Sequence, residues 1–256
     1  MSQQIFDLSG RTALVTGASR GLGQSMAIGL ARAGAHVVIT SRSLASLKQT
    51  QDEITQAGGS THPLVLDVQD VPAMKHQLQT LEDEIGCPDI LVNNAGYEEV
   101  CASVDVDEAL WDKITGTNLK GAFFCSQAVA KGMIKAGKGG SIINVCSLTS
   151  YVGVPTAVPY GSSKSGLLGM TRALSVEWAK DNIRVNAIAP GYFRTDLTDQ
   201  FYQDKDWQEA MLNKIPADRF GGKSDLEGVI VFLAGQSSGY ITGQCIAVDG
   251  GFLASI

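Results

Sequence analysis

The chain has 256 residues and a formal net charge of −6. This length suits one domain with a sizeable hydrophobic core, although length is only a soft prior. The acidic balance and the lack of a long basic run argue against nucleic acid as a partner. No stretch approaches the roughly 18 consecutive apolar residues that a membrane span needs. We therefore expect a single domain over residues 1–256 that binds a small molecule and no membrane.

The cysteines and histidines narrow the class further. Five cysteines, an odd number without Cys-x-x-Cys spacing, suit a reducing compartment with buried thiols. The histidines are scattered without the spacing of metal ligands, so no metal site is expected. The N-terminus lacks the basic and apolar regions of a signal peptide. Together these features favour a cytoplasmic protein.

Apolar runs alternate with helical periods along the whole chain. Strands are predicted at residues 13–15, 37–40, 64–66, 90–92, 141–146, 184–188 and 245–248, with helices between them. Apolar strands without alternation, joined by helices, are typical of a parallel sheet covered on both faces. The pattern predicts an α/β fold of the Rossmann type, with a doubly wound, mostly parallel, seven-stranded sheet.

The first predicted strand runs directly into a glycine-rich loop and then an amphipathic helix over residues 24–33. A strand, a glycine loop and a helix in this order form a cradle for phosphate. Gly17 would make the tight turn, Gly21 would allow close backbone approach, and Gly23 would let the helix pack on the strand. A plain glycine-rich turn between two elements is the alternative.

Tyr160 and Lys164 stand one helical turn apart, and Ser147 closes an apolar segment thirteen residues before Tyr160 (160 − 147). A phenol with a pKa of about 10 exchanges protons poorly at neutral pH, but a lysine ammonium at i,i+4 stabilises the phenolate. Ser147 would hold the substrate oxygen while charge develops on it. Taken alone, this spacing also fits a half-buried tyrosine beside a solvated lysine.

With these features placed, the chain resembles the short-chain dehydrogenase/reductase family from about residue 8 to residue 251. The glycine motif of the family falls on residues 16–23, its Asn-Asn-Ala-Gly on residues 93–96, and its helix-borne asparagine on Asn118. The active-site residues of the family fall on Ser147, Tyr160 and Lys164, and its motifs after the sixth strand on Asn186 and Pro190-Gly191. The resemblance implies that the protein interconverts a secondary alcohol and a ketone with a nicotinamide cofactor.

Cofactor choice is expected to depend on the end of the second strand. An NAD-binding loop places an acidic residue there, whereas a 2′-phosphate requires that this carboxylate be absent and a cation present. Ser41 is uncharged, and Arg42 offers a planar fork to a phosphate. Arg20 in the glycine loop is a second candidate cation. The sequence predicts NADP(H), with Arg42 as an ordinary solvated residue the alternative.

The resemblance implies further roles. Lys164 would hold the nicotinamide ribose as well as tune Tyr160, Asp67 would contact the adenine, and residues 93–96 would line the ribose side. Thr195 would bond the carboxamide. Asn118 would bend its helix around a water that links Lys164 to solvent, although a buried polar residue at a kink fits the same position. The expected cofactor-binding set is Gly17, Ser19, Arg20, Gly21, Leu22, Gly23, Ser41, Arg42, Asp67, Val68, Asn94, Ala95, Gly96, Tyr160, Lys164, Pro190, Gly191, Phe193 and Thr195.

An irregular region at residues 192–222 carries aromatic residues among many charges. It follows the carboxyl end of a strand, where open α/β sheets bind ligands. Long loops in compact domains are usually functional, so we expect a substrate lid rather than a plain surface excursion.

Three segments of the chain narrow the choice of substrate class, because they resemble particular members of the family. Residues 190–195, 216–219 and 248–251 resemble those of bacterial gluconate 5-dehydrogenases, also called 5-keto-gluconate reductases. Several of these residues are shared with 3-oxoacyl carrier-protein reductases. Those enzymes typically place an arginine before the glutamate of the segment that matches residues 175–177, and this chain has Val176 there. The predicted substrate is a polar ketose, a keto-sugar acid or a polyol.

Two glutamates bear on this choice. Glu98 and Glu99 would repel a sugar acid unless Arg194, Lys205 or Arg219 neutralises it, so a neutral polyol or ketone stays open. The alternatives are a 3-oxoacyl carrier-protein reductase and a broad carbonyl or diketone reductase. A catalytically idle NADP-binding sensor or structural subunit is an alternative of another class.

Assembly is suggested by two helical segments, residues 107–135 and 157–180. They carry more apolar residues than one face against a sheet needs. Members of the family usually pair these helices into dimers and tetramers. We expect a homotetramer built as a dimer of dimers, with thick helical cover of the sheet as the alternative.

Overall fold

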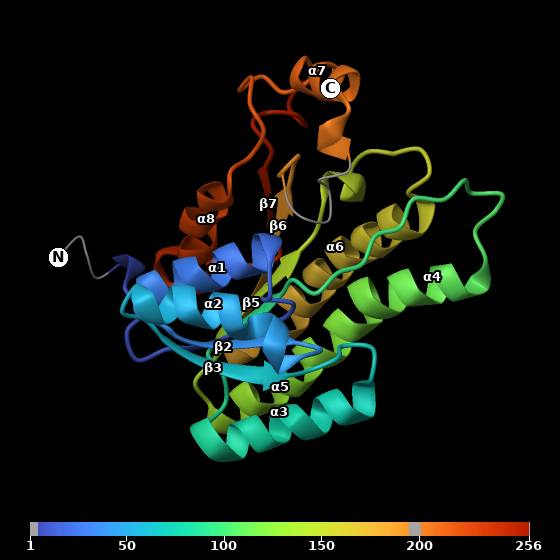
Figure 1. The fold of residues 1–256 in the computed structure, drawn as a ribbon. Coiled ribbons are helices and arrows are strands. Elements are labelled where there is room, and N and C mark those ends of the chain that lie inside the picture. Colours follow the sequence, from blue (N-terminus) through green and yellow to red (C-terminus); the bar gives the residue numbers. More distant parts are fainter. Residues whose placement is uncertain (1–4, 195–200, 256) are drawn as a thin grey trace.

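The computed structural model describes residues 5–194 and 201–255, and these form seven strands in one parallel sheet (Figure 1). The strands are β1 (Thr12–Val15), β2 (His36–Ser41), β3 (Ser60–Val65), β4 (Ile90–Asn93), β5 (Gly140–Val145), β6 (Ile183–Pro190) and β7 (Cys245–Val248). Their order is β3-β2-β1-β4-β5-β6-β7. The strand order reverses between β1 and β4, and open α/β sheets bind ligands outside the carboxyl ends at such a point. The predicted fold class is confirmed.

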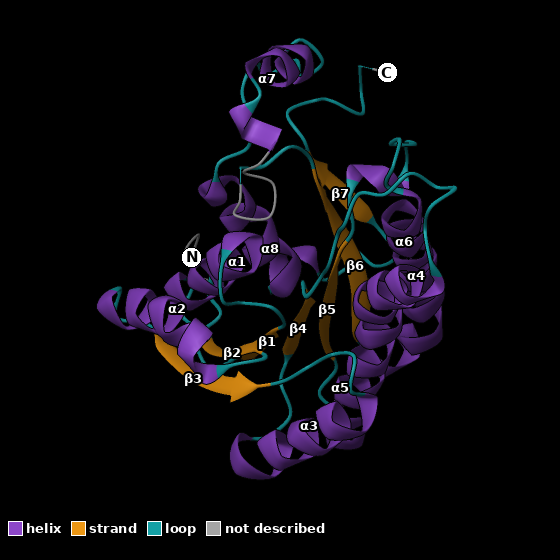
Figure 2. Ribbon diagram, turned by 45° about the vertical axis from the view of Figure 1, so that its right-hand side comes forward, coloured by secondary structure: helices purple, strands orange, loops and turns teal. Residues whose placement is uncertain are grey.

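Helices cover both faces of this sheet. They are α1 (Gly21–Arg32), α2 (Leu44–Gln56), α3 (Val71–Ile85), α4 (Glu108–Thr115), α5 (Ala122–Ala136), α6 (Val158–Trp178), α7 (Lys205–Leu212) and α8 (Glu227–Ala234). Figure 2 shows α1, α2 and α8 on one face and α3 to α6 on the other. The helix α7 lies beyond the carboxyl ends of β6 and β7 (Figure 1).

The central strands are apolar throughout because both of their faces are buried. In β1, Leu14 packs into the core under α3, α5 and α6, whereas Ala13 and Val15 pack into the core under α1, α2 and α8. All three side chains are fully buried. A strand covered on both faces has no solvent side to alternate with, so its sequence reads as a continuous apolar run.

Two elements differ from the sequence expectation. The strand β3 begins at Ser60, four residues before the predicted 64–66, because it is an edge strand with a polar first half and Pro63 inside it. Edge strands tolerate proline and need no apolar face, so the pattern hides them. The segment 107–135 is not one helix. A π-helix, Gly116–Gly121, separates α4 from α5.

No helix within residues 5–194 and 201–255 is long and apolar enough to cross a membrane.

Candidate active site

The glycine loop between β1 and α1 lies against the loop that follows β4. Gly17 has a φ of 64°, and a Cβ added there would lie 2.9 Å from the Ala95 Cα. A Cβ on Gly23 would lie 2.3 Å from Asn94 Nδ2. Asn94 Nδ2 donates to the carbonyl oxygens of Thr16 and Gly17 at 2.9 Å each. Only glycine fits at both positions, and Asn94 braces the loop from the neighbouring strand end.

The N-terminus of α1 opens onto this loop. Its N-cap residue, Arg20, makes no side-chain cap hydrogen bond, and the first turn carries no acidic side chain. The first backbone N–H groups of the helix are therefore available to an anion, and the helix dipole favours negative charge there. This arrangement fits the phosphates of a dinucleotide cofactor.

The end of β2 is uncharged and has cations beside it. Ser41 Oγ donates to the Ser43 carbonyl oxygen at 2.7 Å and lies 2.8 Å from Ser46 Oγ. Arg42 and Arg20 are exposed, and among the described residues neither has an ion-pair partner. These residues leave room for a phosphate on the ribose and offer guanidinium groups to bind it.

Other residues of the expected cofactor set have different surroundings. Asp67 is exposed beyond β3, and its Oδ1 accepts a hydrogen bond from the Gln69 backbone at 2.9 Å. Val68 and Phe193 are 6% and 5% exposed within hydrophobic clusters, so any contact with a cofactor would use their backbone. Ser19, Gly21, Leu22 and Gly191 are half-buried, Gly96 is exposed, and Pro190 ends β6. Thr195 lies outside the described residues.

Asn93 does not share the surroundings of residues 94–96. Its side chain is buried, and its Nδ2 donates to Ser126 Oγ and Asn144 Oδ1 at 2.8 Å each. These partners lie within the sheet and α5, and the expectation that Asn93 lines the ribose side stays a prediction. Asn93 connects β4 to β5 and α5.

Ser147, Tyr160 and Lys164 converge at the carboxyl end of β5. Ser147 follows this strand and caps a 3₁₀ turn, Leu148–Ser150, where its Oγ accepts a hydrogen bond from the Thr149 backbone at 3.2 Å. Tyr160 and Lys164 lie in the first two turns of α6. Lys164 is 4% exposed, and its Nζ donates to the Val145 carbonyl oxygen at 2.7 Å. The three side chains predicted to act together are therefore neighbours.

The pKa of Tyr160 is raised above its usual value of 10. Burial is the main cause and the charge of Glu98 the second, while a hydrogen bond with Ser147 lowers the pKa in part. The Lys164 ammonium, expected to stabilise the phenolate, binds Val145 and lies 5.5 Å from the centroid of the Tyr160 ring. Burial also lowers the pKa of Lys164. Activation of the phenol by Lys164 stays a prediction for the cofactor-bound protein.

Asn118 lies in the π-helix between α4 and α5. Its Oδ1 accepts a hydrogen bond from the Tyr97 N–H at 2.8 Å, and its Nδ2 donates to the Tyr97 carbonyl oxygen and to Ser163 Oγ at 3.0 Å each. The side chain thus joins the loop after β4 to α6. Its proposed part in a water relay stays a prediction. Ser163 had not been identified from the sequence, because only the position of Asn118 distinguishes it from Ser162.

The glycine loop and the catalytic side chains are parts of one site. A Cβ added at Gly96 would lie 3.8 Å from Lys164 Nζ, and Ala95, the residue before it, contacts Gly17. Residues 94–96 therefore connect the phosphate cradle to the N-terminal end of α6, which carries Tyr160 and Lys164. This is the arrangement that a dinucleotide needs when its reactive end meets an acid/base residue.

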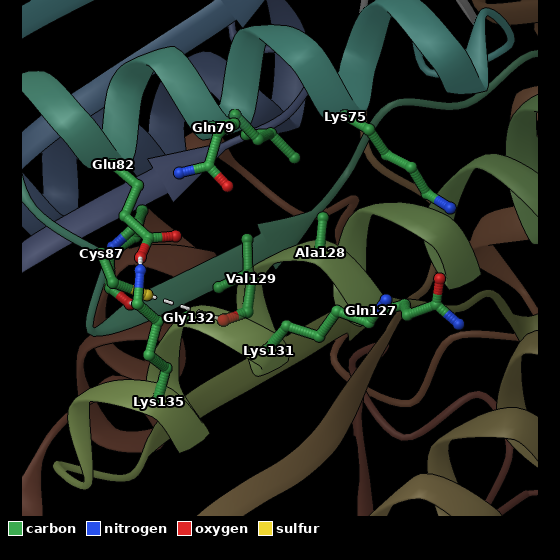
Figure 3. A pocket seen from close by; sticks show the side chains of 12 residues that line it. Lys75, Gln79, Glu82, Cys87, Gln127, Ala128, Val129, Lys131, Gly132 and Lys135 are labelled. Carbon is green, nitrogen blue, oxygen red and sulfur yellow. Dashed lines mark hydrogen bonds and ion pairs between the residues drawn. The ribbon is translucent and has the colours of Figure 1, made fainter.

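A hollow of about 250 Å³ lies between α3 and α5 (Figure 3). In it, Cys87 Sγ donates to the Val129 carbonyl oxygen at 3.6 Å, and Lys135 Nζ lies 3.5 Å from Glu82 Oε1. Burial raises the pKa of the Cys87 thiol to about 11. No residue of the expected site lines this hollow, so it lies apart from the candidate chemistry.

Comparisons with known proteins agree with this arrangement. A family model described as enoyl-(acyl carrier protein) reductase matches residues 17–253. A 2-dehydro-3-deoxy-D-gluconate 5-dehydrogenase from Dickeya dadantii is 44% identical over 249 residues, which cover 97% of this chain and 98% of that protein.

Solved structures extend the likeness to three dimensions. A protein from Sinorhizobium meliloti, described as a short-chain alcohol dehydrogenase, is 62% identical with a TM-score of 0.95, over 98% of this chain and 100% of that one. A gluconate 5-dehydrogenase from Burkholderia cenocepacia, solved with NADP and tartrate, is 34% identical with a TM-score of 0.96, over 100% of both chains. This chain therefore belongs to the short-chain dehydrogenase/reductase family, whose members are oxidoreductases acting on CH–OH groups.

Proposed function

We propose that this protein is an NADP(H)-dependent oxidoreductase that interconverts a ketone and a secondary alcohol in a polar, sugar-derived substrate. The observation that carries the proposal is the convergence of Ser147, Tyr160 and Lys164 beside residues 94–96, which contact the glycine loop. A nucleotide cradle and a proton-transfer group in one contiguous site are what this reaction requires.

In the proposed mechanism, Tyr160 gives its hydroxyl proton to the substrate oxygen during reduction. Ser147 holds that oxygen with a second hydrogen bond. Lys164 has three N–H donors and uses one for Val145, which leaves two for cofactor ribose hydroxyls and for stabilising the Tyr160 phenolate. The bound nicotinamide supplies the hydride. Asn118 fixes the loop that borders the site through its hydrogen bonds to Tyr97. In the proposed relay, its interrupted helix holds a water that links Lys164 to solvent.

The choice of NADP(H) over NAD(H) is supported by the end of β2. The uncharged Ser41 and the exposed Arg42 and Arg20 favour a 2′-phosphate. The solved gluconate 5-dehydrogenase from Burkholderia cenocepacia contains NADP, which supports the same choice here.

The substrate is proposed as a polar ketose, a keto-sugar acid or a polyol. Two proteins that match this chain over nearly their whole length are a 2-dehydro-3-deoxy-D-gluconate 5-dehydrogenase and a gluconate 5-dehydrogenase. Both are named for sugar-derived substrates. Val176 is 82% exposed on α6, so this surface offers an apolar side chain at the position where a carrier-protein reductase typically has an arginine. This observation weakens the carrier-protein alternative.

We also propose that the protein is cytoplasmic and forms a homotetramer as a dimer of dimers. The two helical segments expected to pair expose large apolar side chains, at 40% for Trp111, 46% for Val158 and 82% for Val176. Exposed apolar side chains on neighbouring helices are typical of association surfaces.

The test is a panel assay of NADPH oxidation with ketoses, keto-sugar acids, diketones and acyl thioesters. We expect the highest kcat/KM with a polyhydroxy ketone or keto-acid. A higher kcat/KM with acyl thioesters would contradict the substrate class, and binding of NADPH without turnover of any compound would favour the idle subunit.

A further inference from the structure

We propose that Glu98 is a specificity-determining residue, which accepts hydrogen bonds from hydroxyl groups of the substrate and makes the site prefer a neutral polyhydroxy ketone over a keto-acid. This inference rests on the proposed function and names the substrate class within it. Support for it lies in the contacts of three successive residues, Tyr97, Glu98 and Glu99.

Tyr97 and Glu99 lie side by side in the segment after β4 and contact the same lysine. The Tyr97 hydroxyl donates to Glu99 Oε2. Lys113 Nζ lies 3.8 Å from the centroid of the Tyr97 ring and 3.8 Å from Glu99 Oε2. Glu98, the residue between them, takes no part in these contacts.

Asn118 fixes the orientation of this segment. It pairs with both the N–H and the carbonyl oxygen of Tyr97, so the backbone cannot rotate without breaking two hydrogen bonds. The same side chain binds Ser163, which precedes Lys164 on α6. Glu98 is thereby held in a set position relative to the catalytic end of α6.

The charges around Glu98 show which groups it faces. Burial raises the pKa of Glu98, and Lys164 lowers it in part. After burial, the charge of Glu98 contributes to the raised pKa values of Tyr160 and Tyr192. These effects agree with the geometry of the loop, because a Cβ added at Gly96, two residues before Glu98, would lie 3.8 Å from Lys164 Nζ.

The Glu98 carboxylate keeps its acceptor capacity for a ligand. Among the described residues, no hydrogen-bond donor or ion-pair partner binds its oxygens. Glu99, in contrast, is already bound by Tyr97 and Lys113. A half-buried carboxylate with free acceptors favours hydroxyl donors in its surroundings and repels a second carboxylate.

One cation expected to neutralise a substrate acid is already paired. Arg219 binds Asp225 through two hydrogen bonds of 2.6 and 3.1 Å. Binding a substrate acid with this guanidinium would first require breaking a bidentate pair. This pairing adds to the preference for a neutral substrate that Glu98 creates.

The test uses 5-keto-D-gluconate and L-sorbose, which carry a carboxylate and a CH₂OH group, respectively, on the same keto-polyol chain. We expect the parent enzyme to reduce L-sorbose with at least tenfold higher kcat/KM. Glu98→Gln should lower this preference tenfold or more. Glu99→Gln is the matched control, because it removes the same charge from a residue that pairs with Lys113. It should change the preference less than twofold. A parent preference for the keto-acid, or equal shifts in both variants, would overturn the role of Glu98.

Measurements of ligand binding test the role of Glu98 separately from the proposed function, because they do not depend on turnover. Calorimetry of the NADPH-loaded protein with D-sorbitol and D-gluconate makes the same comparison without turnover, because the reduced cofactor cannot accept hydride from an alcohol. Tighter binding of sorbitol, lost in Glu98→Gln alone, supports the assignment even if both ketones are reduced slowly. Tighter binding of gluconate by the parent overturns the assignment. The proposed function fails separately if the parent oxidises NADPH with no ketone of the panel. Unchanged melting temperatures of both variants show that folding is not the cause.

Discussion

Tyr160 lies in surroundings that oppose its ionisation. Burial and the charge of Glu98 raise the pKa of its hydroxyl, and the hydrogen bond with Ser147 offsets this only in part. Proton transfer near neutral pH needs a lower pKa, and cations near a phenol lower it. We infer that the cofactor-bound site, with Lys164 stabilising the phenolate, differs in this respect from the structure described above.

A pH profile tests the contribution of Glu98. Alcohol oxidation needs the Tyr160 phenolate, so its rate rises with pH through the pKa of this group. Glu98→Gln removes a negative charge that raises this pKa, and the rising limb should move to lower pH. Glu99→Gln should leave the limb in place, because Glu99 pairs with Lys113. A move to higher pH in Glu98→Gln would contradict the assignment.

Cofactor preference depends on two residues at the end of β2. Ser41→Asp with Arg42→Leu should shift preference toward NAD(H) by tenfold or more. The new carboxylate repels a 2′-phosphate, and the lost guanidinium removes a charge-assisted hydrogen bond of about 1.5–3 kcal/mol, where ~1.4 kcal/mol is a factor of ten. Steady-state kinetics with both cofactors measure the shift, with Arg42→Leu alone as the control. A parent that prefers NADH would show that the interpretation of Ser41 and Arg42 is wrong.

At the scale of elements, the segment after β6 is anchored by aromatic packing. Tyr202 lies 4.7 Å from Phe220 and 5.2 Å from Trp207 between ring centroids, and Tyr192 lies 5.4 Å from Phe252. The helix α7 has no buried residue, and Trp207 provides its ring contacts with Tyr202 and Phe220. Elements with few core contacts open at low free-energy cost. The lid expected at residues 192–222 stays a prediction. Within this region, α7 is the element in which opening is easiest to test, because it has no buried residue.

Hydrogen exchange measures closure of this segment. We expect the amides of α7 to gain more protection than those of β6 and β7 when NADPH and a slow substrate bind, because closure excludes water from the hydride path. Equal changes in α7 and in the two strands would indicate a fixed wall of the site rather than a lid.

At the scale of the whole molecule, the apolar side chains exposed on α4 and α6 predict association. Light scattering coupled to size exclusion should give about four times the 27.0 kDa of one chain, because pairing these helices buries Trp111 and Val158. A single-chain mass at micromolar concentration would favour the alternative, in which the helices only cover the sheet.

Much of this fold could be predicted from the sequence because its signals are local. The buried strands read as apolar runs, and the glycine loop and the Tyr160-Lys164 pair have fixed spacings. Features that depend on distant packing could not be predicted. The start of β3 is hidden by its exposure at the sheet edge, and the burial of Asn93 follows from contacts with β5 and α5. The two hydrogen bonds between Asn118 and the Tyr97 backbone depend on the packing of the loop after β4 against the π-helix, which no local spacing indicates.

Tyr160→Phe is the decisive test of whether Tyr160 transfers the proton in an NADP(H)-dependent reaction. This change removes only the hydroxyl, so the ring still packs and the glycine loop is untouched. Turnover and NADPH affinity are measured together, by steady-state assay and fluorescence titration. We expect a loss of turnover of at least a hundredfold, the lower end of what general acid–base catalysis contributes, with nearly unchanged affinity for NADPH. Turnover within tenfold of the parent would contradict this expectation.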